Sequence, residues 1–118
     1  MTLTWLKASQ FLSEVESTIK EDLQHTEASG LSIVAVHILN ELYQSDGQKA
    51  SELARKVGRP ATSFTPILDL LENEKYIKRS PHKTDRRAVI ISLTAKGKAL
   101  QTAIENAIGN AEVRYGGK

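Results

Sequence analysis

The 118 residues have the size of one domain, and 40% hydrophobic with 25% charged residues is the composition of a folded protein rather than a disordered one. The absence of cysteine excludes a thiol redox switch and a cysteine-ligated metal, and no apolar run approaches the roughly 20 residues that cross a bilayer. Acidic residues occur early and no secretory signal pattern precedes them, so we expect a cytoplasmic protein.

The net charge of +2 is distributed unevenly along the chain. Residues 1–48 carry a formal charge of −5, residues 49–97 carry +6, and residues 98–118 carry +1. A concentrated basic segment is typical of a nucleic-acid-binding surface, although solvated charged faces occur in proteins of every class.

The first predicted element is a long amphipathic helix from Thr2 to about Gln24. Its apolar residues recur every three or four positions, at Trp5, Ala8, Leu12, Val15, Ile19 and Leu23. This helix is about twice the mean length of about 11–12 residues. We therefore expect part of it to pack against a partner helix.

A polar break leads to a second helix, from Ile33 to about Gln44, for which Ser32 is the expected N-cap. The next helix spans Ala50 to Val57, and Gly58 follows at a position suited to a left-handed stop. The helix after it carries an i, i+3, i+4, i+7 stripe that predicts a core-facing side: Phe64, Ile67, Leu68 and Leu71.

Pro66 conflicts with that fourth helix, because proline lacks an N–H and clashes with the preceding turn. We expect a late start with Thr62 or Ser63 as N-cap, which places Pro66 in the first turn, where amides are unpaired in any case. The alternative is a start near Pro60 and a kink at the proline.

The period then changes to that of strands. Tyr76–Arg79 and Ala88–Leu93 are rich in β-branched and aromatic residues, and the basic loop 80–87 lies between them. Thr94 is the expected cap of a final helix, from Ala95 to about Val113.

These elements predict a mainly α fold with a small β hairpin (α+β), a winged helix-turn-helix flanked by long N- and C-terminal helices. We expect a single domain over residues 1–118. Residues 31–94 would be its DNA-binding core, and residues 1–24 and 95–113 would be flanking, dimerising helices.

At this point the chain resembles the MarR-type transcriptional regulators. The order and spacing agree from about Leu31 to Leu100, in four segments: Ser51-Glu52-Leu53-Ala54, Leu70-Leu71-Glu72 before Tyr76-Ile77, Asp85-Arg86-Arg87-Ala88 and Leu93-Thr94-Ala95-Lys96-Gly97. The resemblance implies a homodimeric winged-helix protein that binds double-stranded DNA, a repressor released by a small aromatic or lipophilic effector.

The sequence departs from that family in two places. Pro66 and Leu70 stand where the recognition helix often carries basic residues. The family's second C-terminal helix also has no counterpart, so we expect a dimer that is weak or that needs DNA to form.

In the hairpin loop, Arg86 and Arg87 are expected to enter the minor groove, with Lys83 adding positive charge and Asp85 holding one guanidinium in place. The alternative is a salt bridge that stabilises the hairpin alone, worth about 0–1 kcal/mol when exposed.

On the recognition helix, hydroxyl groups near the N-terminal end suit phosphates or base edges of the major groove, although the same hydroxyls can cap a helix. Basic residues around the turn are candidates for contacts to the DNA backbone. The predicted DNA-binding residues outside the loop are Lys49, Arg59, Thr62, Ser63, Thr65 and Pro66. Phe64 is expected in the core.

The predicted dimer interface takes apolar and small residues from the two flanking helices: Trp5, Leu12, Val15, Ile19, Leu100, Ala103, Ile104 and Ala107. An effector pocket is expected between the long helices and the helix-turn-helix, near Trp5 and Phe11, although both residues suit an ordinary core.

No catalytic constellation or phosphate-binding glycine loop is visible, so we expect neither an enzyme nor a cofactor. The three histidines, His25, His37 and His82, lack metal-ligand spacing. The rival interpretation is a winged-helix module that binds proteins without reading DNA. The basic loop argues against it, and exposed Pro66 and Leu70 argue for it.

Overall fold

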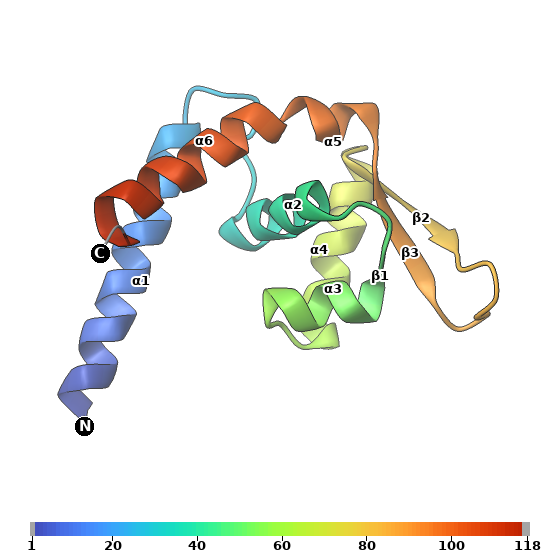
Figure 1. The fold of residues 1–118 in the computed structure, drawn as a ribbon, viewed down its shortest axis with the longest axis horizontal. Helices are drawn as coiled ribbons and strands as arrows, with labels where there is room; N and C mark the ends of the chain where they lie inside the picture. Colours follow the sequence, from blue (N-terminus) through green and yellow to red (C-terminus); the bar gives the residue numbers. More distant parts are fainter. Residues whose placement is uncertain (1, 117–118) are drawn as a thin grey trace. The chain divides into compact units, whose positions relative to one another are not determined.

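A computed structural model of the chain describes the backbone of residues 2–116, and the side chains of all of these except residues 2–5, 61 and 116. Backbone packing divides the chain into two compact units. One comprises Met1–Ile33 with Thr102–Lys118, and the other comprises Val34–Gln101. The structure is mainly helical with one small sheet, so the predicted fold class is confirmed (Figure 1).

The unit Val34–Gln101 is built on three helices, α2 (Ile33–Gln44), α3 (Ala50–Val57) and α4 (Ala61–Asn73). Their apolar stripes are buried, as the periodicity predicts, and each buried aliphatic side chain contributes about 1.5–3 kcal/mol to stability. This core includes Ile38, Leu39, Leu42, Leu53, Phe64, Leu68, Leu71 and Ile91. α3 ends as predicted at Gly58, whose φ of 77° places it in the left-handed region.

The predicted late start of α4 is wrong, and the alternative, a start near Pro60, is the one that the structure has. The helix begins at Ala61, directly after Pro60, and no side chain caps it. The first turn closes on the carbonyl of Pro60, which accepts the N–H groups of Ser63 at 3.1 Å and Phe64 at 3.0 Å. The backbone thus supplies the acceptor for which the prediction invoked a hydroxyl.

Pro66 therefore lies inside α4, not in its first turn. A proline at this position cannot donate the N–H that would pair with the carbonyl of Thr62 four residues earlier. The helix tolerates this loss, because the Thr62 carbonyl lies on its exposed side, where water can donate a hydrogen bond to it. Pro66 itself is exposed.

The sheet has three strands, where the sequence predicted a two-stranded hairpin. β2 (Ile77–Pro81) and β3 (Val89–Leu93) form the hairpin, and β1 (Gln48–Lys49) pairs with the other side of β3. All pairs are antiparallel, in the order β1-β3-β2. β2 is thus an edge strand, which explains how it accommodates Pro81 at its end.

The exit of the hairpin is fixed by polar contacts around Gly97, in α5 (Ala95–Ala99). Thr94 caps α5 as predicted, because its hydroxyl accepts the N–H of Gly97 at 3.1 Å and donates to the carbonyl of Lys75 at 2.6 Å. The Tyr43 hydroxyl donates to the carbonyl of Gly97 at 2.6 Å. A Cβ at position 97 would overlap the carbonyl oxygen of Tyr76, so only glycine fits.

The predicted final helix, 95–113, is interrupted at Leu100. α5 ends there, α6 (Gln101–Ala111) follows, and the π-helical turn η1 (Glu112–Gly116) comes last.

The other unit pairs α1 (Thr2–Leu23) with α6 and η1. The Thr18 and Tyr115 hydroxyls are hydrogen-bonded at 2.9 Å, and the Phe11 and Tyr115 rings meet edge-on with centroids 5.8 Å apart. Within this unit lies a mostly apolar cavity of about 260 Å³, lined by Phe11, Val15, Ile19, Ile108, Ala111, Glu112 and Tyr115. No helix in the described part of the chain is long and apolar enough to cross a membrane.

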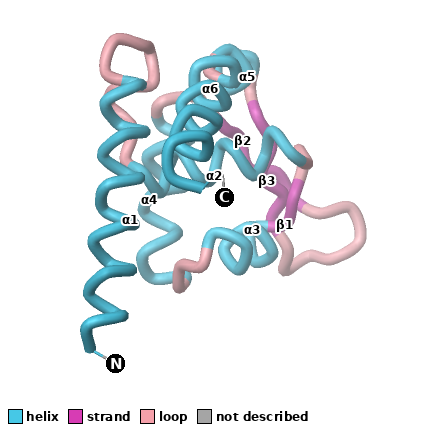
Figure 2. The backbone as a smooth tube through the Cα atoms, turned by 60° about the vertical axis from the view of Figure 1, so that its left-hand side comes forward, coloured by secondary structure: helices cyan, strands magenta, loops and turns pink. Residues whose placement is uncertain are grey.

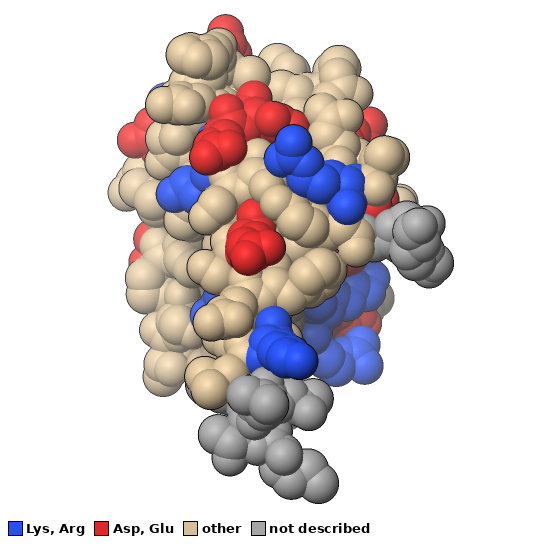
Figure 3. Space-filling model, turned by 90° about the vertical axis from the view of Figure 1, so that its left-hand side faces the viewer, with Lys and Arg blue, Asp and Glu red and all other residues tan. Residues whose placement is uncertain are grey.

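Charges are interspersed among uncharged side chains on the face drawn in Figure 3.

Candidate nucleic-acid interface

The loop between β2 and β3, residues 82–88, projects from the helices of its unit in both ribbon and tube views (Figures 1 and 2). We call it the wing loop. It carries the predicted basic residues Lys83, Arg86 and Arg87, and all three are exposed.

The backbone of the wing loop is ordered by its own side chains. Nδ1 of His82 accepts the N–H groups of Thr84 at 3.2 Å and Asp85 at 3.0 Å. The carboxylate of Asp85 accepts the N–H of Arg87 at 3.0 Å, an Asx turn. The N–H of Ala88 donates to the Asp85 carbonyl at 3.1 Å. The two arginines are thus presented on a loop of defined shape.

The predicted role of Asp85, to hold a guanidinium, is wrong. Its carboxylate binds the backbone amide of Arg87, because a short side chain reaches an amide two residues on more readily than a long, mobile side chain. In the described part of the chain no acid lies within ion-pair distance of Arg86 or Arg87. Their charges remain available to a ligand.

The exposed side of α4 has a different character. The sequence from Ala61 to Asn73 contains no lysine or arginine, and its exposed row consists of Thr62, Pro66 and Leu70. Leu70 is 49% exposed. The predicted hydroxyls are on this helix as well: Ser63 and Thr65 are exposed, and the Ser63 hydroxyl donates to the Pro60 carbonyl at 3.2 Å.

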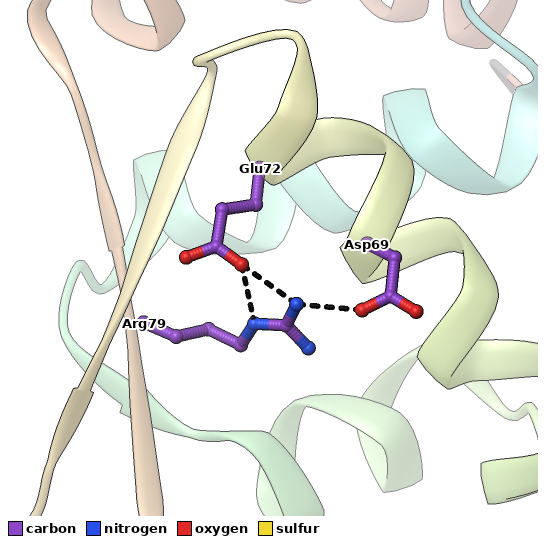
Figure 4. Close-up of polar contacts among 3 residues, drawn as sticks. All are labelled: Asp69, Glu72 and Arg79. Carbon is purple, nitrogen blue, oxygen red and sulfur yellow. Dashed lines mark hydrogen bonds and ion pairs between the residues drawn. The ribbon is translucent and has the colours of Figure 1, made fainter.

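The two acids of α4 are paired with Arg79 on β2 (Figure 4). Nε of Arg79 donates to Glu72 at 2.8 Å, and Nη2 donates to Asp69 at 2.6 Å. These carboxylates, Asp69 first and Glu72 second, raise the pKa of the Arg79 guanidinium. The arrangement offsets one of the two negative charges and fastens α4 to the strand that leads into the wing loop.

Some polar residues around α3 make hydrogen bonds within the fold, and others are exposed on the surface. Lys49 is half-buried and precedes α3 in extended conformation without a capping bond. The side chain of buried Gln48 donates to the carbonyls of Glu41 at 3.1 Å and Ser45 at 2.6 Å, and accepts from Lys56 at 3.0 Å. Arg59, after the turn, is exposed and remains a candidate for a phosphate contact.

Comparison with known proteins supplies the family. The sequence model of the MarR family matches residues 31–89, half of the chain. This chain belongs to the MarR family. The match ends at the start of β3 and includes α2, α3, α4 and the whole wing loop.

Among curated relatives, the chain is 33% identical over 70 residues to the uncharacterised HTH-type transcriptional regulator YfiV of Bacillus subtilis. The match covers 59% of this chain and 44% of YfiV. It is 26% identical over 98 residues to the transcriptional repressor MdtR of the same species, covering 76% of this chain and 63% of MdtR. The chain thus spans about half the length of these relatives.

Among solved structures, the fold is similar to that of Streptococcus pneumoniae FabT in a complex with DNA, with a TM-score of 0.78. The likeness covers 96% of this chain and 78% of FabT at 20% identity, so it concerns the winged-helix fold alone.

The predicted interface residues have different exposures in the single chain. Leu12 is 58% exposed, and Val15 and Ala103 are half-buried. Four others are already buried within the chain: Ile19, Leu100, Ile104 and Ala107. Trp5 lies outside the residues whose side chains are described.

Sequence reasoning missed two residues of this MarR-family site. The ion pairs of Arg79 could have been suspected from the sequence, because Asp69 and Glu72 are three residues apart on the helix that precedes its strand. His82 had no such signal, because its role is to accept backbone amides. In the described part of the chain no group of three His, Cys, Asp or Glu side chains gathers as metal ligands would.

Proposed function

We propose that this MarR-family chain is a sequence-specific regulator of transcription that binds double-stranded DNA, with α4 in the major groove and the wing loop in the minor groove. The observation that carries the proposal is the pair Arg86 and Arg87, exposed on an ordered loop and without acidic partners in the described part of the chain. DNA is the partner whose chemistry uses such a loop, because narrow minor grooves concentrate negative potential.

The exposed hydroxyls of α4 support the same assignment. A hydroxyl group can hydrogen-bond to a phosphate or to a base edge in the major groove. The pairing of Asp69 and Glu72 by Arg79 reduces the repulsion that two free carboxylates would exert on phosphates, because the guanidinium offsets one of their two charges.

We further propose a repressor that acts as a homodimer in the cytoplasm. The repressor assignment is supported by the likeness to MdtR. The dimer is supported by large apolar side chains exposed on α1 and η1, namely Leu6, Phe11, Leu12 and Val113. A two-fold dimer would bind half-sites about 34–36 Å apart, one turn of DNA. A small aromatic or lipophilic effector remains a prediction. The apolar cavity beside Phe11 has a lining that would suit such a ligand.

The test is selection of a duplex from random sequences, followed by affinity measurements from about 50 to 200 mM salt. We expect log K to fall with log salt by about 0.9 for each phosphate neutralised. Sedimentation with and without a duplex of two half-sites would report the dimer. If no duplex is bound, or if the affinity does not change with salt concentration, the chain is a winged-helix module for binding proteins.

A further inference from the structure

The exposed row of α4 has a chemistry that selects one base pair. We propose that Thr62, Pro66 and Leu70 contact the C5-methyl groups of thymines, so that A·T pairs occupy the part of each half-site that α4 covers. This inference rests on the proposed function, since it requires α4 to lie in the major groove.

The geometry comes from helical spacing. The three residues lie at i, i+4 and i+8 of one α-helix, so they follow each other along nearly one line. At about 1.5 Å per residue the row is roughly 12 Å long, which matches three to four steps of about 3.4 Å along a DNA strand. All three side chains are exposed, and Leu70 has 49% of its surface free.

The charges on α4 exclude the commonest alternative. Guanine is typically bound by two hydrogen bonds from arginine or lysine to O6 and N7. α4 has neither residue between Ala61 and Asn73. Asp69, which could accept a bond from cytosine, is held at 2.6 Å by Nη2 of Arg79. The helix thus carries no cation that could select guanine, and the carboxylate that could accept from cytosine is shared with Arg79.

Thymine suits the uncharged side chains of the exposed row of α4. Its methyl group is the apolar feature of the major-groove edge, and a threonine methyl, a proline ring and a leucine are apolar partners for it. A single exposed leucine is ordinary on any protein surface. Leu70 is informative because it continues a row with Pro66 and Thr62 on the helix that Arg79 joins to β2, the strand that leads into the wing loop. Burial of one methyl group is worth roughly fourfold in affinity.

The experiment replaces single thymines by deoxyuridine, which removes only the methyl group, at each position of a selected duplex. We expect roughly fourfold weaker binding at two or three adjacent steps of each half-site, and no change in the flanking sequence. In Leu70→Ala, the loss of affinity on deoxyuridine substitution should disappear at one position, because that thymine methyl group no longer has a leucine to contact. Arg86→Ala is the matched control, and it should lower the affinity while keeping the ratio between thymine and uracil duplexes.

Equal affinity for thymine and uracil at every position would overturn the inference and leave DNA binding intact. A selected half-site rich in G·C under α4 would overturn it as well. Failure to bind any duplex would instead overturn the proposed function. The deoxyuridine series uses the unaltered protein, so it decides the question even if Leu70→Ala folds poorly, which thermal unfolding would report.

Discussion

α4 and the wing loop belong to the same unit, but they carry opposite kinds of side chain. α4 has no basic residue, and its two acids are tied to Arg79. The wing loop has three basic residues, and the single acid among them, Asp85, is engaged with the backbone. On the proposed function, this difference would separate the charge that attracts DNA from the surface that distinguishes one DNA sequence from another.

This separation has a measurable form. Contacts from cations to phosphates depend on salt and act alike on every sequence, whereas contacts to base edges set the order of preference among sequences. Substitutions in the wing loop should therefore change the affinity and its salt dependence. Substitutions on α4 should change which duplex is preferred.

The largest effect is expected from removing both wing arginines. The double substitution Arg86→Ala and Arg87→Ala should weaken binding by at least about 1–3 kcal/mol, the cost of one groove-contacting arginine, and reduce the salt slope by about 0.9 per lost phosphate contact. Titration of the selected duplex at several salt concentrations would measure both. Lys98→Ala, an exposed charge on α5, is the control. An equal loss in that control would mean that net charge alone matters.

A smaller effect is expected from Arg79→Ala, which releases two carboxylates beside the side of α4 proposed to face DNA. We expect affinity to fall by about 1–2 kcal/mol, because charged hydrogen bonds that fix the helix are lost. Adding Asp69→Asn and Glu72→Gln should restore part of the affinity by removing the repulsion.

Arg79→Lys separates the geometry of this contact from its charge. Lysine keeps the charge but lacks the planar fork that joins Asp69 to Glu72, so it should bind DNA less tightly than the original protein. Unfolding free energies measured in parallel show whether folding has suffered. Full affinity in Arg79→Lys would show that charge is sufficient and that the fork does not position α4.

The smallest effects are expected at Asp85. Asp85→Asn retains an oxygen that accepts the Arg87 amide and removes one negative charge, so DNA binding should tighten by a few tenths of a kcal/mol. Asp85→Ala also removes the charge but loses the turn, and it should weaken binding by up to about 1 kcal/mol. Affinity measurements on the two variants side by side decide the matter. If both variants bind DNA more tightly, the turn formed by Asp85 does not contribute to the affinity for DNA.

The fold was predictable where local pattern determines it. The stripe from Phe64 to Leu71, the stop at Gly58 and the cap at Thr94 all depend on spacing or on one residue's chemistry, and the structure has each of them. β1 was missed because a strand of two residues, Gln48 and Lys49, has no periodicity. The start of α4 was misplaced because a backbone carbonyl closes its first turn.

The candidate site divides in the same way. The positions of Arg86 and Arg87 at the end of a loop follow from the strands on either side. The contacts of Asp85 and Arg79 do not, because they depend on which atoms tertiary packing brings within about 3 Å. A carboxylate beside arginines in sequence is free to bind a guanidinium or an amide, and sequence alone does not rank the two.

The crowding at Gly97 has an evolutionary consequence. Its neighbours include Tyr43, Tyr76 and Thr94, and a Cβ, which every other amino acid would add, has no room. Substitution is therefore blocked at position 97, in the joint between the hairpin and α5. The side chains of Thr62, Pro66 and Leu70 are exposed, so on the proposed function a few surface substitutions on α4 would change the DNA sequence that is bound, while the frame around Gly97 stays the same.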